Sequence, residues 1–147
     1  MIKRQTSRLT RTNLGFLLAK ASHRWNEQLA ARFRAAGFAE VRPSYGSVLV
    51  PLFEEDSLRM GELARRARLS KQTMTTLVRL AERDELVVRE RDPSDARAYR
   101  VSLTPRARAF EPVAGRVLEE LERLVAARLP PGQSETLRAA LRDVADL

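Results

Sequence analysis

The sequence contains no cysteine among its 147 residues, a single histidine and only six glycines. The lack of cysteine excludes disulfides, thiolate metal sites and cysteine-based redox sensing within the chain. A histidine-rich metal site is excluded too, and the acidic run over residues 54–56 is interpreted as a solvated turn, so we expect no metal or cofactor. No phosphate-cradling glycine loop and no Gly-x-Ser-x-Gly turn is present, so we do not expect an enzyme.

Long hydrophobic runs are also missing. No apolar stretch approaches the roughly 18 residues that a membrane-spanning helix needs, and the first residues, MIKRQTSRLTRTN, do not form a signal peptide. We therefore expect no membrane association and a cytoplasmic protein. Aromatic residues make up only 5%, so leucine, valine and alanine must fill the core that a hydrophobic content of 44% allows. A chain of this length fits one domain.

Positive charge is in excess and is unevenly distributed. The sequence has 27 basic and 19 acidic residues, a net charge of +8. Residues 1–42 carry nine basic against two acidic groups and residues 58–108 carry thirteen against seven, whereas residues 109–147 carry five against seven. Clustered positive charge suits a polyanion, because neutralising phosphates releases condensed counterions. The charge distribution therefore favours a polyanion partner, and among polyanions we expect double-stranded DNA because of the helix and hairpin pattern of residues 60–104.

Apolar residues recur at three- and four-residue steps and predict helices over residues 13–36, 44–53, 60–67 and 70–83. Pro51 is expected to kink or shorten the second helix. Residues 86–91 and 98–103 predict two short strands joined by a turn-rich linker. Thr104-Pro105 is a strong helix start and is followed by a helical pattern of about 25 residues, and a last helix follows Pro130-Pro131-Gly132. The apolar stripe after Thr104 is too long for one small domain to cover, which predicts packing against a second chain.

The predicted helix over residues 70–83 has one apolar and one polar face. Met74, Leu77, Val78 and Ala81 fall on the buried side, and the opposite side carries Lys71, Gln72, Thr73, Thr75, Thr76 and Arg79. The N-terminal residues of a recognition helix reach deepest into the major groove, so we assign base contacts to Gln72, Thr73 and Thr76. Lys71 and Arg79 are assigned to phosphates or a guanine edge, and Ser70 to the helix cap and a phosphate. A merely solvated surface is the alternative, but threonine is a poor choice where only helicity matters.

The two predicted strands form a basic hairpin, with Arg89, Arg91, Arg97 and Arg100 around its tip. Asp95 precedes Arg97 by two residues, and we predict that its carboxylate holds the Arg97 guanidinium in a fixed orientation. An arginine presented in this way suits a narrow minor groove. The alternative is an ordinary surface ion pair of little energetic value.

In their order and spacing these segments resemble the MarR family of winged helix-turn-helix regulators. The matching pieces are Gly61-Glu62-Leu63-Ala64, the run from Leu69 to Leu80, the wing from Asp92 to Arg97, and Leu103-Thr104. The close similarity spans residues 58–108, and the helical layout extends it to nearly the whole chain. The sequence departs from the family at Glu85 and Ala107, where glycine is usual. The first departure can shift the turn between helix and wing, and the second is harmless within a helix.

The resemblance implies a mainly α fold with a small β wing, in one domain over residues 1–147. Residues 43–104 would form the winged helix-turn-helix DNA-binding region, and residues 13–42 and 105–147 the N- and C-terminal dimerisation helices. It further implies a homodimer that binds a palindromic operator as a transcriptional regulator, most often a repressor.

The family also commonly responds to small phenolic or anionic effectors. By the family's geometry the candidate ligand residues are His23, Arg24, Trp25 and Tyr45. The alternative is that Trp25 is a packing residue and His23 a surface residue. For the whole chain, the rival interpretation is an effector-independent architectural or protein-interaction dimer, and an enzyme is a more distant third.

Overall fold

The structure is a computed structural model that describes residues 10–147; the first nine residues of the predicted single domain lie outside the described part. The elements in order are α1 (Leu14–Ala35), the 3-10 turn η1 (Pro43–Tyr45), α2 (Gly46–Glu54), β1 (Leu58–Arg59), α3 (Met60–Ala67), α4 (Lys71–Arg83), β2 (Val87–Asp92), β3 (Asp95–Leu103), α5 (Pro105–Ala126) and α6 (Gln133–Ala145). The predicted mainly α fold with a small β wing is confirmed.

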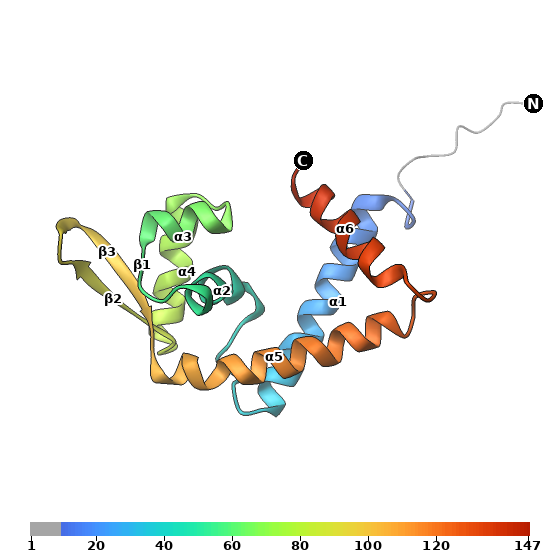
Figure 1. Ribbon diagram of the computed structural model, residues 1–147, viewed down its shortest axis with the longest axis horizontal. Coiled ribbons are helices and arrows are strands. Elements are labelled where there is room, and N and C mark those ends of the chain that lie inside the picture. The colour runs from blue at the N-terminus through green and yellow to red at the C-terminus, as the bar shows by residue number, and fades with distance from the viewer. Residues whose placement is uncertain (1–9) are drawn as a thin grey trace, which may run out of the picture.

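Figure 1 shows two groups of elements. Helices α2, α3 and α4 and the sheet form one group, which we call the reading head (residues 43–104). Helices α1, α5 and α6 form the other, which we call the arms (residues 13–42 and 105–147). The chain passes between the two groups twice, once through η1 and once at Thr104, directly before α5.

The sheet is antiparallel, with the strand order β1-β3-β2. Val87 pairs with Leu103 and Arg91 with Tyr99, and the hairpin closes at Asp92 and Asp95 after an irregularity in the register. Strand β2 lies one residue later than predicted and β3 begins three residues earlier, so only Pro93 and Ser94 remain in the turn. The sequence reasoning missed β1, because two residues carry no periodic signal.

The predicted buried face of α4 is confirmed. Met74, Val78 and Ala81 are completely buried, and Leu77 packs partly buried against the same core. Other fully buried core residues of the reading head are Val48, Leu49, Leu52, Leu63, Leu86 and Val101. Helix α2 continues through Pro51 to Glu54, so the proline does not end it.

The turn between α4 and β2 keeps a left-handed residue at Glu85, with a φ of 61°. The Leu86 N–H donates to the Ala81 carbonyl and the Glu85 N–H to the Glu82 carbonyl, the pattern that closes a helix with a left-handed residue. A side chain thus occupies a position that glycine prefers, at some cost in backbone strain. Ala107, the second departure from the family, is buried in the first turn of α5.

An aromatic cluster joins the two arm helices near the reading head. The rings of Phe33 and Phe110 meet edge to face at 4.8 Å, and Phe38 lies 5.3 Å from Phe110. The Arg106 guanidinium lies 3.8 Å from the centre of the Phe38 ring, and its Nε is 2.7 Å from a Glu40 oxygen. These contacts fix the end of α1 against the start of α5.

Candidate nucleic-acid interface

Helices α3 and α4 form the helix-turn-helix. Arg68 ends α3 in the left-handed conformation with a φ of 54°, and Ser70 then caps α4. The Ser70 hydroxyl accepts a hydrogen bond from the Thr73 N–H at 3.1 Å and donates one to the Thr73 hydroxyl at 2.9 Å. The predicted N-cap is therefore confirmed. Thr73 keeps its own hydroxyl proton for a partner outside the chain.

The polar face of α4 is open to solvent. Lys71, Gln72, Thr73, Thr76 and Arg79 are exposed, and Thr75 is half-buried. The hydroxyls of Thr75 and Thr76 donate to the carbonyls of Lys71 and Gln72, at 2.7 and 3.1 Å. With these protons engaged, the two threonines present oxygen lone pairs and methyl groups rather than donors.

Charge pairing separates two kinds of basic residue in the reading head and the first turn of α5. Nine of the thirteen basic residues in 58–108 form ion pairs with carboxylates: Arg59, Arg65, Arg66, Arg68, Arg83, Arg89, Arg100, Arg106 and Arg108. Within residues 10–147, the other four have no carboxylate partner, and they are Lys71, Arg79, Arg91 and Arg97. All four are among the predicted DNA contacts, on α4 and the wing.

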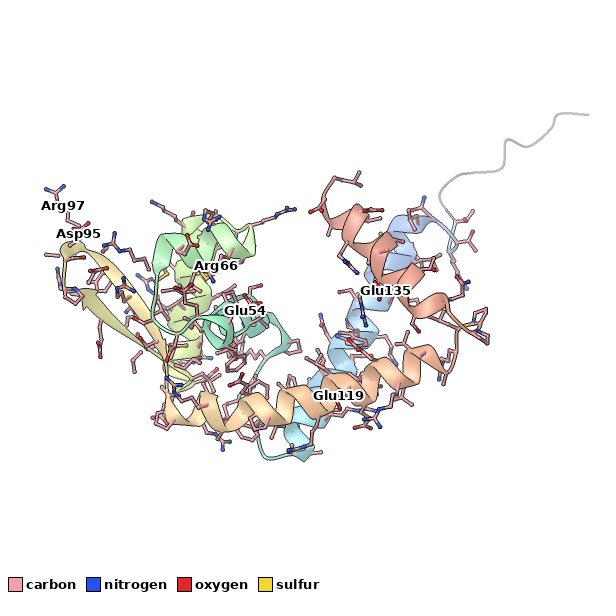
Figure 2. All side chains as sticks on the ribbon, in the orientation of Figure 1. Glu54, Arg66, Asp95, Arg97, Glu119 and Glu135 are labelled. Atoms are coloured by element: carbon pink, nitrogen blue, oxygen red, sulfur yellow. The ribbon has the colours of Figure 1, made fainter. Side chains whose placement is uncertain are left out.

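Glu62 illustrates the paired kind. It accepts hydrogen bonds from Arg65 and Arg66, which lower its pKa from an ordinary value of 4.5 to about 2. Arg66 also donates to Glu55, and Figure 2 shows Arg66 projecting from α3. The positive charge of α3 is therefore largely neutralised within the chain.

The wing tip differs in detail from the prediction. Asp95 Oδ1 accepts a hydrogen bond from the main-chain N–H of Arg97 at 3.0 Å, not from its guanidinium. The predicted carboxylate–guanidinium pair is therefore wrong, because the main-chain N–H two residues on lies closer to so short a side chain. Arg97 is exposed and extends outward from the tip (Figure 2). Its guanidinium has no hydrogen-bond partner among the described residues.

Asp92 organises the root of the tip and was missed by sequence reasoning. Its side chain is 1% exposed and accepts hydrogen bonds from the Ser94 N–H and hydroxyl and from Nε of Arg59 and Arg100. Ser94 and Arg59 hold the pKa of this carboxyl well below its usual range. Arg59 directly precedes α3, so Asp92 ties the wing to the helix-turn-helix. The Asp92-x-Ser94 spacing signals the turn, but nothing local signals the two arginines.

Two further sets of contacts hold the side chains of Arg89 and Arg91 on β2. Glu82 on α4 accepts hydrogen bonds from the main-chain N–H and Nε of Arg89. The Tyr99 ring lies 5.6 Å from the guanidinium carbons of both Arg89 and Arg91. Arg91 also donates to the Ala96 carbonyl at 2.8 Å, which leaves its positive charge without a carboxylate.

The four candidate ligand residues do not form one site. His23 and Arg24 are exposed on α1, where both contact Glu27. Trp25 is half-buried and lines a groove of about 380 Å³ between α1, α5 and α6. Tyr45 is completely buried in η1, and its hydroxyl donates to Asp84 at 2.5 Å. Burial raises the pKa of Tyr45, and the hydrogen bond lowers that of Asp84.

Residues 10–147 contain no cluster of three or more side chains suited to hold a metal ion. In the same part of the chain, no helix has the length and apolar character that crossing a bilayer requires.

The chain is similar to proteins of one family. A model of the MarR family matches residues 52–98, whereas no curated protein sequence matches the chain significantly. A probable transcriptional regulator from Pseudomonas aeruginosa is 27% identical, with a TM-score of 0.77 over 90% of this chain and 97% of its own.

Two further solved structures share the fold. PcaV from Streptomyces coelicolor, solved with its natural ligand, is 21% identical with a TM-score of 0.77 over 92% of this chain and 93% of its own. MepR from S. aureus, solved with DNA, is 19% identical with a TM-score of 0.76 over 90% of this chain and 96% of its own. Residues 52–98, which hold helices α3 and α4 and strand β2, thus match the MarR family of transcriptional regulators, and the chain as a whole shares the fold of these three solved proteins.

Proposed function

We propose that the chain is a sequence-specific DNA-binding repressor that acts as a homodimer on a palindromic operator. The proposal rests mainly on four basic residues of α4 and the wing that have no carboxylate partner within residues 10–147. They are Lys71, Arg79, Arg91 and Arg97. Cations without a carboxylate partner are available to phosphates and groove edges, whereas paired ones must first give up a partner. The MepR structure with DNA supports this role for the shared fold. A cytoplasmic location is part of this proposal, since the protein would act on chromosomal DNA.

Roles follow from position on α4. We propose that Gln72, Thr73 and Thr76 contact DNA bases and that Lys71 and Arg79 contact DNA phosphates. Gln72 offers an amide that can pair with adenine, and Thr76 offers a methyl group for thymine and an acceptor for a cytosine amino group. The remaining proposed contacts are Ser70 and Thr75 on the helix, and Arg89, Arg91, Asp95 and Arg97 on the wing. Of these, Asp95 acts indirectly, by holding the Arg97 main chain.

The homodimer is supported by apolar surface on the arms. Exposed large hydrophobic residues are Leu14, Phe16 and Leu17 on α1, Leu118 and Leu124 on α5, and Leu137, Leu141 and Val144 on α6. No side chain of α6 is fully buried within its own chain, and the large apolar ones remain over a third exposed. A second copy pairing arm to arm would cover these residues. Two reading heads would then lie on one face of the duplex, as a palindrome requires.

For an effector we propose an aromatic anion bound at the groove beside Trp25. The walls at Leu137 and Leu141 are apolar, and Arg138 and Arg142 lie on the rim. Both arginines already pair with Glu135, so an anion would have to displace that carboxylate. PcaV, a protein of this fold, was solved with its natural ligand, which supports a ligand site in the fold. Binding that favoured one dimer shape would change operator affinity.

The decisive experiment selects bound sequences from random duplex DNA with the full-length protein, alongside sedimentation velocity. We expect enrichment of a two-fold symmetric site and a sedimenting dimer. A matched chain with Gln72→Ala and Thr76→Ala should enrich the same site much less. A monomer, or a dimer that enriches no sequence over the input pool, would reject the proposal; the latter result would favour an architectural dimer.

A further inference from the structure

The two connections between the arms and the reading head converge on one dipeptide. Tyr45, in η1, donates its hydroxyl hydrogen bond to Asp84 Oδ2 at 2.5 Å. Thr104, directly before α5, donates its hydroxyl hydrogen bond to the Glu85 carbonyl at 2.7 Å. Asp84 and Glu85 immediately follow α4. Figure 1 shows this end of α4 next to the start of α5.

Main-chain hydrogen bonds also attach this dipeptide to α4. The Asp84 N–H donates to the Leu80 carbonyl and the Glu85 N–H to the Glu82 carbonyl, both at 3.0 Å. Leu86, the next residue, is completely buried. A movement of residues 84–85 would therefore carry the C-terminal end of α4 with it.

The two side chains that bind this dipeptide from the connections, those of Tyr45 and Thr104, are constrained as well. The Tyr45 side chain is completely buried, so its ring cannot swing away without opening the core. The Thr104 hydroxyl also accepts a hydrogen bond from the Ala107 N–H at 3.2 Å and so caps α5. A single hydroxyl thus joins the first turn of α5 to the end of α4.

We propose that Tyr45 and Thr104 are positioning residues that fix the angle of α4 relative to the arms and thereby set the operator spacing that the dimer accepts. The inference rests on the proposed function. Helix α4 has 13 residues, which makes it about 20 Å long. A rotation of about 10° about its C-terminal end would move its N-terminal end by roughly 3.4 Å, the rise of one base pair. In a dimer, the distance between two such ends must match the roughly 34 Å repeat of the major groove.

The test compares binding to three duplexes. One is the site that the full-length wild-type protein selects from random DNA, and the others have one base pair inserted or removed at its centre. Tyr45→Phe removes only the hydroxyl, and Thr104→Val removes the hydrogen bond to the Glu85 carbonyl together with the cap of α5 at the Ala107 N–H. We expect each variant to lose about two- to tenfold of the wild-type preference for the selected spacing, the range that one hydrogen bond covers. Affinity for random DNA should remain unchanged.

Conservative variants serve as controls. Asp84→Asn keeps an acceptor for Tyr45, and Thr104→Ser keeps the hydroxyl, so both should conserve most of the spacing preference. A purely structural role predicts another pattern, in which the melting temperature falls and binding to all three duplexes weakens by the same factor. That uniform loss, or a wild-type spacing preference in both Tyr45→Phe and Thr104→Val, would overturn the inference alone. A wild-type protein that selects no duplex would overturn the proposed function and the inference together.

Discussion

Glu82 on α4 accepts hydrogen bonds from both the main-chain N–H and Nε of Arg89 on β2, at 3.1 and 3.2 Å. This pair holds the base of the wing against the recognition helix. We expect Glu82→Ala to lower the free energy of unfolding by about 1–2 kcal/mol, because it leaves a main-chain N–H and a guanidinium without their acceptor. Urea denaturation measures the change. Glu90→Ala, which removes an exposed carboxylate of β2, should change stability much less.

Arg97 is expected to contribute to DNA affinity and not to folding. Arg97→Ala should weaken binding to the selected operator by about 1–3 kcal/mol, as for an arginine that reads a groove. Sedimentation should show the same assembly as the wild type, because the guanidinium forms no hydrogen bond or ion pair within residues 10–147. Arg34→Ala removes the same charge from an exposed position on α1 and is the control. Equal affinity of Arg97→Ala and the wild type in a fluorescence titration would remove the wing tip from the interface.

Base reading and phosphate contact can be separated on α4. Gln72→Ala and Thr76→Ala should each narrow the difference between operator and random DNA by about 1–3 kcal/mol. Lys71→Ala should instead weaken binding to both and reduce the slope of log affinity against log salt by about one. Competition titrations at several salt concentrations measure both effects. Parallel losses on operator and random DNA in all three variants would assign Gln72 and Thr76 to phosphates.

The pKa of Glu62 predicts a pH dependence of stability. Because the folded pKa of about 2 lies below the ordinary value of 4.5, the contribution is complete above about pH 4.5 and is lost as the pH falls toward 2. In Glu62→Gln the decline in the urea midpoint over this window should be shallower than in the wild type. Glu111→Gln, on an exposed face of α5, should retain the full decline. Identical profiles for Glu62→Gln and the wild type would contradict the role of Arg65 and Arg66.

Glu85 occupies a left-handed position that glycine tolerates without strain. We expect Glu85→Gly to raise the free energy of unfolding by about 0.5–1 kcal/mol, since relief of the side-chain clash exceeds the added entropy of the unfolded chain. Glu85→Ala keeps the β-carbon and should give no comparable gain. Thermal denaturation of the wild type, Glu85→Gly and Glu85→Ala measures these differences in stability. A more stable Glu85→Ala would show that the charge of Glu85, rather than its backbone conformation, is unfavourable.

Local signals predicted the elements that position the interface. The spacing of Met74, Val78 and Ala81 identified the buried face of α4, and Ser70 identified its start, because caps and periodicity are written within a few residues of sequence. The contact between Asp92 and Arg59 depends on residues 33 positions apart, so no local pattern indicates it. The wing tip was predictable only in part. The turn was predicted, but whether Asp95 would meet a guanidinium or a main-chain N–H depended on the geometry of the turn.

The ion pairing of the basic residues could not be predicted from the sequence either. The sequence places thirteen basic residues in 58–108 and predicts a polyanion partner, but it cannot tell paired from unpaired cations. Arg59 and Arg97 look alike in sequence. In the folded chain Arg59 is bound by Asp92, whereas Arg97 is left to solvent.

Helix α6 has 13 residues, and none of its side chains is fully buried within one chain. A helix of this length is marginal in water when so little of it is covered. Its survival against proteases should therefore rise with protein concentration, because only association can shield it. A regulator built in this way links its own half-life to its abundance, since dilute molecules expose the segment at which degradation can begin.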